Sequence, residues 1–189
     1  MKFSIPCVIF AGGKSSRMKE DKALLPFGDC KTLAEYQYKK MLAIFDRVYI
    51  STKSNKFPFK ASLLFDNNDN FAPTYAFLSI FSQLKDEALF VISVDTPFVN
   101  KNIINSILQT HKKNCYDIVV AKSPNGVHPL CGVYTKKVVP ALNSMINKNI
   151  HRLNLLLKKI DTYFLYFEDD RPFFNINYPK EYKTAIKMV

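Results

Sequence analysis

Short, mostly apolar segments alternate with longer amphipathic segments along this chain. Continuous apolar runs are typical of strands buried on both faces of a sheet, whereas apolar positions three and four residues apart indicate helices. The apolar runs predict strands at residues 5–10, 47–51, 63–65, 88–94, 117–121, 127–134, 163–167 and 173–176. The amphipathic segments predict helices at residues 32–45, 74–84, 100–112, 136–146, 151–158 and from 179 onward.

This alternation predicts an α/β fold with a Rossmann-like, three-layer αβα arrangement. A mostly parallel central sheet would carry helices on both faces, as in nucleotide-diphospho-sugar transferases. The length of 189 residues fits a single domain spanning residues 1–189. Ligands bind such sheets at the carboxyl ends of the strands. The residues to consider for function therefore follow the apolar runs, namely the 11–22 loop, Ser51, Asp66, Asp95, Asn175 and Asn177.

The chain is basic, with a formal net charge of +11 from 27 Lys and Arg against 16 Asp and Glu. Such a charge fits a polyanionic partner, an anionic membrane surface or a phosphorylated small molecule. The lysines are scattered along the chain, which disfavours a nucleic-acid partner. No apolar run approaches the length of a membrane span and the first residues lack a signal-peptide pattern. We therefore expect a cytoplasmic protein that binds neither nucleic acid nor membrane.

The cysteines are too widely spaced for metal or redox motifs. No C-x-x-C pair occurs among Cys7, Cys30, Cys115 and Cys131. This spacing excludes zinc ribbons and thioredoxin-like chemistry.

The sequence "AGGKSSRMKEDK" (11–22) directly follows an apolar run and raises the question of a phosphate loop. A P-loop requires G-x-x-x-x-G-K-[ST], and its first glycine would fall at Val8, inside the predicted strand. The G-x-G-x-x-G dinucleotide fingerprint is absent as well. The loop is therefore neither of these two motifs.

Another way of holding phosphate fits this loop. Gly12 and Gly13 let backbone N–H groups approach an anion, and the cations Lys14, Arg17 and Lys22 follow. Arginine can clamp phosphate oxygens with two parallel hydrogen bonds, and lysine acts as a point charge. From the residues alone, a phosphate cradle and a solvated basic turn remain open alternatives.

The longer motif "FAGGKSSRMKEDKALLPF" resembles the signature of nucleotidyltransferases that activate small phosphorylated molecules, and most resembles the molybdenum cofactor guanylyltransferases, or MobA-like proteins. The resemblance recurs in order along nearly the whole chain, at "LLFD" (63–66), "VISVDTPFV" (91–99), "HPL" (128–130) and "FFNINYPKEY" (173–182). The chain departs from the family where Lys19 replaces a glycine and where residues 72–76 replace Gly-Pro-Leu-Ala-Gly.

The resemblance implies an enzyme that transfers GMP from GTP to the terminal phosphate of molybdopterin and releases pyrophosphate. Asp95 would hold Mg²⁺, a hard cation that prefers oxygen ligands. Arg17 and Lys22 would stabilise the charge that develops in the transition state. The catalytic residues implied are thus Arg17, Lys22 and Asp95.

The resemblance also divides the remaining residues between nucleotide and acceptor. The nucleotide-binding set comprises Phe10, Ala11, Gly12, Gly13, Lys22, Ser51, Asp66 and Asp95. The Asp66 carboxylate suits the adjacent N–H donors of guanine. His128, Asn175 and Asn177 would form the acceptor side, and the two asparagines would share one face of a short strand. Partners would include cofactor-biosynthesis and molybdoenzyme chaperone proteins.

Other functions remain open on the sequence. One is a cytidylyltransferase acting on molybdopterin or on a polyol or sugar phosphate. Another is a non-catalytic nucleotide-binding adaptor of the same fold, although that role would not require the carboxylate of Asp95. Asp95, Asp66, Asn177 and His128 are also residue types that simple turns use.

Overall fold

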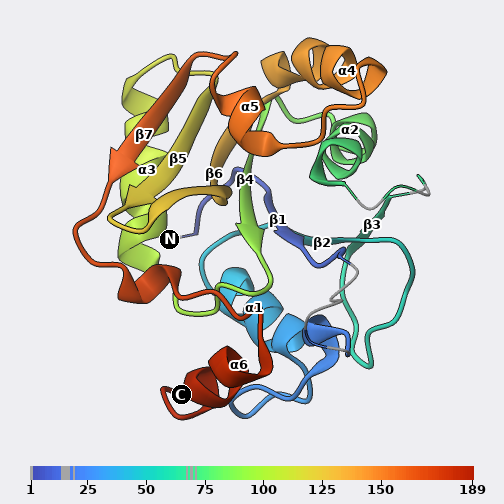
Figure 1. Ribbon diagram of the computed structural model, residues 1–189, viewed down its shortest axis with the longest axis vertical. Coiled ribbons are helices and arrows are strands. Elements are labelled where there is room, and N and C mark those ends of the chain that lie inside the picture. The colour runs from blue at the N-terminus through green and yellow to red at the C-terminus, as the bar shows by residue number, and fades with distance from the viewer. Residues whose placement is uncertain (1, 14–17, 19, 67, 69, 71) are drawn as a thin grey trace.

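A seven-stranded sheet forms the centre of the molecule (Figure 1). The computed structural model describes residues 2–13, 18, 20–66, 68, 70 and 72–189. Along the sheet the strands follow the order β3-β2-β1-β4-β6-β5-β7. Their bounds are β1 Cys7–Phe10, β2 Val48–Thr52, β3 Leu63–Phe65, β4 Ala88–Ser93, β5 Ile118–Ser123, β6 Gly126–Thr135 and β7 Thr162–Tyr166.

Most neighbouring strands run parallel. The strands β3, β2, β1 and β4 are mutually parallel, and β7 is parallel to β5. The exception is β6, which lies antiparallel between β4 and β5. The α/β fold with a mostly parallel sheet is therefore confirmed.

Helices cover both faces of the sheet. They are α1 Leu33–Leu42, α2 Pro73–Gln83, α3 Lys101–Lys113, α4 Val139–Asn147, α5 Leu153–Leu157 and α6 Pro179–Ile186. Alternate residues of β1 divide between two cores, with Cys7 and Ile9 in one and Val8 and Phe10 in the other. Buried side chains of α1, α3 and α6 belong to the first core, and those of α2, α4 and α5 belong to the second. None of the helices in the described ranges is both long and apolar enough to cross a membrane.

The helix boundaries follow from their capping residues. The side chain of Thr32 accepts from the Glu35 N–H, and that of Asn100 accepts from the Ile103 N–H. These residues satisfy backbone donors that the first helical turn leaves free. The predicted helices at 32–45 and 100–112 are therefore confirmed, each with a polar residue as its N-cap.

The predicted strand at 173–176 is wrong. A short 3₁₀ helix, Arg171–Phe173, includes its first residue, and a segment without regular secondary structure follows. The backbone N–H of Ile176 donates to the carbonyl of Asp95 at 2.9 Å rather than to a neighbouring strand. Phe173 and Ile176 are buried. The apolar pattern therefore predicted the burial of these side chains correctly but predicted the wrong secondary structure.

Candidate active site

The carboxyl ends of β1, β2, β3 and β4 meet at one edge of the sheet, because these strands are parallel. The segments that follow β1 and β4 border a cavity of about 330 Å³. Its lining includes Gly12, Gly13, Lys22, Asp95 and Asn177. The fold thus brings together residues from the start, middle and end of the chain.

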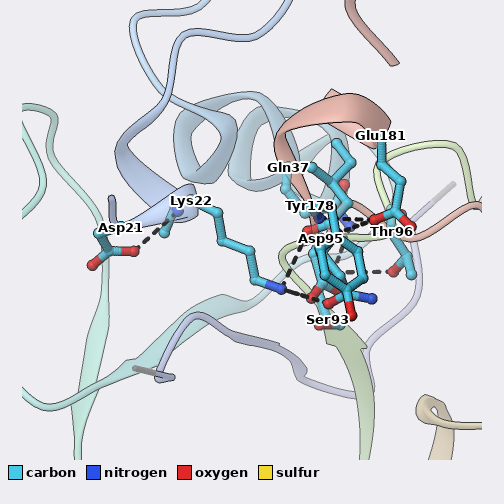
Figure 2. Close-up of polar contacts among 11 residues, drawn as sticks. Asp21, Lys22, Gln37, Ser93, Asp95, Thr96, Tyr178 and Glu181 are labelled. Carbon is cyan, nitrogen blue, oxygen red and sulfur yellow. Dashed lines mark hydrogen bonds and ion pairs between the residues drawn. The ribbon is translucent and has the colours of Figure 1, made fainter. Parts of the chain in front are cut away.

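Lys22 lies at the centre of this site (Figure 2). It begins a 3₁₀ turn, Lys22–Leu24, which is capped by Asp21 through a 3.1 Å hydrogen bond from the Ala23 N–H. The Lys22 ammonium forms an ion pair with the Asp95 carboxylate. It also donates to the side-chain oxygen of Asn177 at 3.2 Å and to the carbonyl of Ile176 at 3.3 Å. One ammonium group therefore joins three distant segments of the chain.

Asp95 is buried, and only one of its two carboxylate oxygens has a partner among the described residues. It follows β4 and has a relative exposure of 6%. Its Oδ2 contacts Lys22, whereas its Oδ1 has no hydrogen-bond partner among the described residues. Buried polar atoms without a partner are rare and frequently mark a functional site. Asp95 therefore has one buried oxygen whose hydrogen-bonding capacity no described residue uses.

The glycine loop is open above its backbone. The Ala11 N–H donates to the Ser51 carbonyl at 3.1 Å, which fixes the start of the loop beside β2. A Cβ atom added at Gly12 or Gly13 would meet no described atom within 4 Å. No described residue therefore blocks the approach of ligand atoms at the Cβ side of Gly12 and Gly13. Arg17 lies outside the described residues.

A smaller cavity of about 140 Å³ continues from the loop toward β2 and β3. Phe10, Gly12, Ser51 and Asp66 contribute to its lining. The Asp66 carboxylate accepts from the Ser79 hydroxyl at 3.1 Å and the Asn68 N–H at 3.2 Å. The predicted nucleotide residues that fall in the described ranges thus surround two adjoining cavities.

Two of the three predicted acceptor-side residues line a third and larger cavity, of about 610 Å³, which Asp95 also borders. It is lined by His128 and Asn175, whereas Asn177 lines the cavity beside Lys22. The two asparagines do not share one face of a strand, because no strand forms there. The predicted strand that would have aligned them is therefore wrong, but Asn175 and Asn177 both border a further cavity of about 490 Å³, together with His128.

His128 forms a fixed part of the wall of this third cavity. Its ring stacks on Phe173 with centroids 4.3 Å apart and an interplanar angle of 9°. Its Nε2 is 2.7 Å from the Ser123 hydroxyl oxygen. Burial lowers the pKa of His128, which favours the neutral imidazole.

The segment that departs from the family pattern does not fill the cavities with its aromatic ring. The Tyr75 ring packs against His151, with centroids 5.1 Å apart. The Thr74 hydroxyl oxygen is 2.9 Å from Nδ1 of the same histidine. Residues 72–76 therefore attach the start of α2 to the segment before α5.

Sequence reasoning missed several side chains that support the site. Gln37 and Lys40 of α1 donate to carbonyls of the Ser93–Pro97 segment, and Lys56 pairs with Asp21 and donates to the Ala11 carbonyl at 3.3 Å. Gln37 alone carried a signal, because it is a polar residue at an apolar helical position. The two lysines are too similar to the many surface lysines to be distinguished by sequence.

The fold is that of a nucleotidyltransferase domain. Its structure is similar to that of molybdopterin-guanine dinucleotide biosynthesis protein A from Archaeoglobus fulgidus, with a TM-score of 0.84 at 18% identity, covering 97% of this chain and 98% of that one. The chain belongs to the MobA-like NTP transferase domain family, whose model matches residues 7–162. The family resemblance inferred from the sequence motifs is thus confirmed.

Two relatives extend this similarity to nearly the full length. A protein named molybdenum cofactor guanylyltransferase from Campylobacter jejuni (strain 81116) is 39% identical over 179 residues, covering 94% of this chain and 93% of its own. A protein of the same name from Helicobacter pylori (strain G27) is 34% identical over 191 residues, covering 98% of this chain and 94% of its own. The similarity therefore includes the segment around Asn177, beyond the range of the family model.

Proposed function

We propose that this protein is a molybdenum cofactor guanylyltransferase, in which a single domain transfers GMP from GTP to the terminal phosphate of molybdopterin. The observation that carries the proposal is the contact of Lys22 with both Asp95 and Asn177 beside an open glycine loop. The names of the relatives supply the substrates. A cytoplasmic location is part of the proposal and is supported by the four free thiols.

The nucleotide would bind along the first two cavities. The backbone of Ala11, Gly12 and Gly13 would approach the phosphates, with Phe10 beside them. Ser51 and Asp66 would face the base, where a carboxylate can accept from the two adjacent guanine donors. Asp66 would exchange part of its present hydrogen bonding for these contacts.

A divalent metal fits the donor set around Asp95. The partnerless Oδ1 of Asp95 and the amide oxygen of Asn177 are hard oxygen donors. The described residues contain no group of three His, Cys, Asp or Glu side chains that could hold a metal by themselves. That is consistent with Mg²⁺, which commonly takes one or two carboxylates and completes its shell with substrate phosphates and water. When bound, Mg²⁺ would supply charge neutralisation at the α-phosphate and the leaving pyrophosphate.

The protein residues would position the reactants and neutralise charge. The attacking group is a phosphate that is already ionised, so the reaction needs little general base catalysis. Lys22, together with Arg17, would stabilise the negative charge that develops on the transferred phosphoryl group. His128 and Asn175 would hold the acceptor in the third cavity, with Asn177 between acceptor and metal.

The direct test is transfer of labelled GMP from GTP to molybdopterin in the presence of Mg²⁺, with CTP and ATP as competing donors. Asp95→Asn should lower the rate by about 100-fold or more, since losing one preorganised electrostatic contact typically costs about 3 kcal/mol. Asp86→Asn is the matched control, because Asp86 pairs with Arg47 before β4, at the opposite end of the same strand. Transfer from CTP alone would indicate a cytidylyltransferase, and nucleotide binding without transfer would indicate an adaptor.

A further inference from the structure

The helix α1 is hydrogen-bonded to the segment that carries Lys22 and to the segment that carries Asp95. At its start, the Leu33 N–H donates to the Leu25 carbonyl at 2.7 Å. Leu25 is the C-cap of the 3₁₀ turn that Lys22 begins. The position of Lys22 is therefore tied to the first turn of α1.

The next turns of α1 hold the segment that carries Asp95. The Gln37 side-chain amide donates to the Ser93 carbonyl at 3.2 Å and the Thr96 carbonyl at 3.4 Å (Figure 2). Lys40, three residues further along the same helix, donates to the Pro97 carbonyl at 2.5 Å. Together the two side chains reach carbonyl groups on both sides of Asp95.

The segment after β4 is a turn, and the α1 side chains add to its backbone hydrogen bonds. Those bonds join the Val94 N–H to the Phe10 carbonyl at 3.0 Å and the Ile176 N–H to the Asp95 carbonyl at 2.9 Å. The Ser93 carbonyl also accepts from the Thr96 hydroxyl at 3.1 Å, so it retains a partner without Gln37. Within the described part of the chain, Gln37 is the hydrogen-bond donor to the Thr96 carbonyl. Gln37 itself has no exposed surface, although glutamine is usually an exposed residue type. An apolar side chain would fill the same space without holding the turn.

We propose that Gln37 is a positioning residue for the transfer site: it fixes the turn that presents Asp95 and so sets the geometry between Asp95 and Lys22. This inference rests on the proposed metal-dependent function, in which Asp95 must meet both a cation and the phosphates. Residues that orient a metal ligand typically change metal affinity by about 10- to 100-fold when they are replaced. Gln37 does not touch the reacting atoms and acts through Asp95.

The test is Mn²⁺ binding measured by electron paramagnetic resonance, with and without α,β-methylene-GTP, a donor that cannot release pyrophosphate. Gln37→Met keeps the volume but removes both N–H donors. Tyr38→Phe is the matched control, because the Tyr38 hydroxyl accepts from the Ser62 N–H at 3.1 Å, away from Asp95. Each variant thus loses hydrogen bonding between α1 and a neighbouring segment. Urea unfolding verifies that both variants are folded.

Gln37→Met should raise the Mn²⁺ dissociation constant by about tenfold, whereas Tyr38→Phe should leave it unchanged. Equal Mn²⁺ affinity in wild type and Gln37→Met, or an equal loss in both variants, would overturn the positioning role. Absence of Mn²⁺ binding by the wild type would overturn it as well, together with the metal role of Asp95. Binding that depends on Gln37 in a protein without GMP transfer would overturn the proposed function but leave the positioning role intact.

Discussion

Replacing Lys22 with methionine would remove the ammonium that contacts Asp95 while keeping a side chain of similar length. The Asp95 carboxylate would then stay buried, because its side chain is only 9% exposed. Its Oδ2 would lose the ion pair, and its Oδ1 has no partner among the described residues. The variant would therefore contain a buried negative charge without compensation.

The expected size of this effect follows from the burial of the pair. Removing one partner of a buried ion pair costs about 3–5 kcal/mol, because the remaining charge is desolvated without compensation. The Lys22 side chain is 17% exposed, so water partly screens the pair and the lower end applies. We expect Lys22→Met to lower the free energy of unfolding by about 3 kcal/mol. Adding Asp95→Asn should restore part of the lost free energy of unfolding, because the second substitution removes the uncompensated buried carboxylate.

Urea unfolding of the nucleotide-free protein tests this through the complete double-mutant cycle. The coupling energy between the two positions should lie within about 1–3 kcal/mol, as for residues in direct contact. Mn²⁺ should stabilise Lys22→Met by about 2.7 kcal/mol at 100 times its dissociation constant, but should not stabilise the double variant. A Lys22→Met protein as stable as wild type, or one that Mn²⁺ does not stabilise, would refute the reasoning.

Two further predictions concern stability at positions other than Lys22 and Asp95. In Gly132→Ala the new Cβ would lie 2.2 Å from the Val119 carbonyl oxygen, so urea titrations should show a free energy of unfolding about 3 kcal/mol lower than that of wild type. In Gly12→Ala the new Cβ would meet no described atom within 4 Å, so the free energy of unfolding should stay within about 0.5 kcal/mol of the wild-type value. Burial lowers the pKa of Lys40 from 10.5 to about 8. Between these two pH values the folded protein has lost the Lys40 proton and the unfolded chain still binds it, so folding becomes more favourable as the pH rises. The free energy of unfolding of wild type should therefore increase relative to that of Lys40→Met over this pH interval. A pH-independent difference between these two proteins in that interval would contradict the second prediction.

The parts of the site that lie on regular elements could be predicted from the sequence. β1 is an uninterrupted apolar run, and β4 is apolar up to its last residue, Ser93. Such runs are recognisable without knowledge of their neighbours. Because Gly12 and Asp95 directly follow these strands, the parallel topology alone placed them at one edge of the sheet. Their separate local patterns were enough to propose a common site.

The contacts made by irregular segments could not be predicted in the same way. Lys22 and Asn177 are 155 residues apart, and each lies in a segment without a periodic pattern. The largely apolar stretch 173–176 resembles a strand, but Phe173 ends a 3₁₀ helix that contains Pro172. The backbone N–H of Ile176 then donates to the Asp95 carbonyl instead of to a neighbouring strand. A local sequence pattern indicates which side chains are buried. The hydrogen-bond partner of a backbone group outside regular elements depends instead on the tertiary structure.

The C-terminal segment contains hydrogen bonds that fix the position of Asn177, although Asn177 lies outside any helix or strand. The Glu181 carboxylate accepts from the N–H groups of Asn177 at 2.6 Å and Tyr178 at 2.9 Å, which caps the start of α6. The same helix buries Ala185 in the core that contains α1. Asn177 is therefore held from the C-terminal side by α6, while Asp95 and Lys22 are held by α1. Because both helices pack into one core, the relative positions of the Asp95 carboxylate, the Lys22 ammonium and the Asn177 amide depend on a single packed layer.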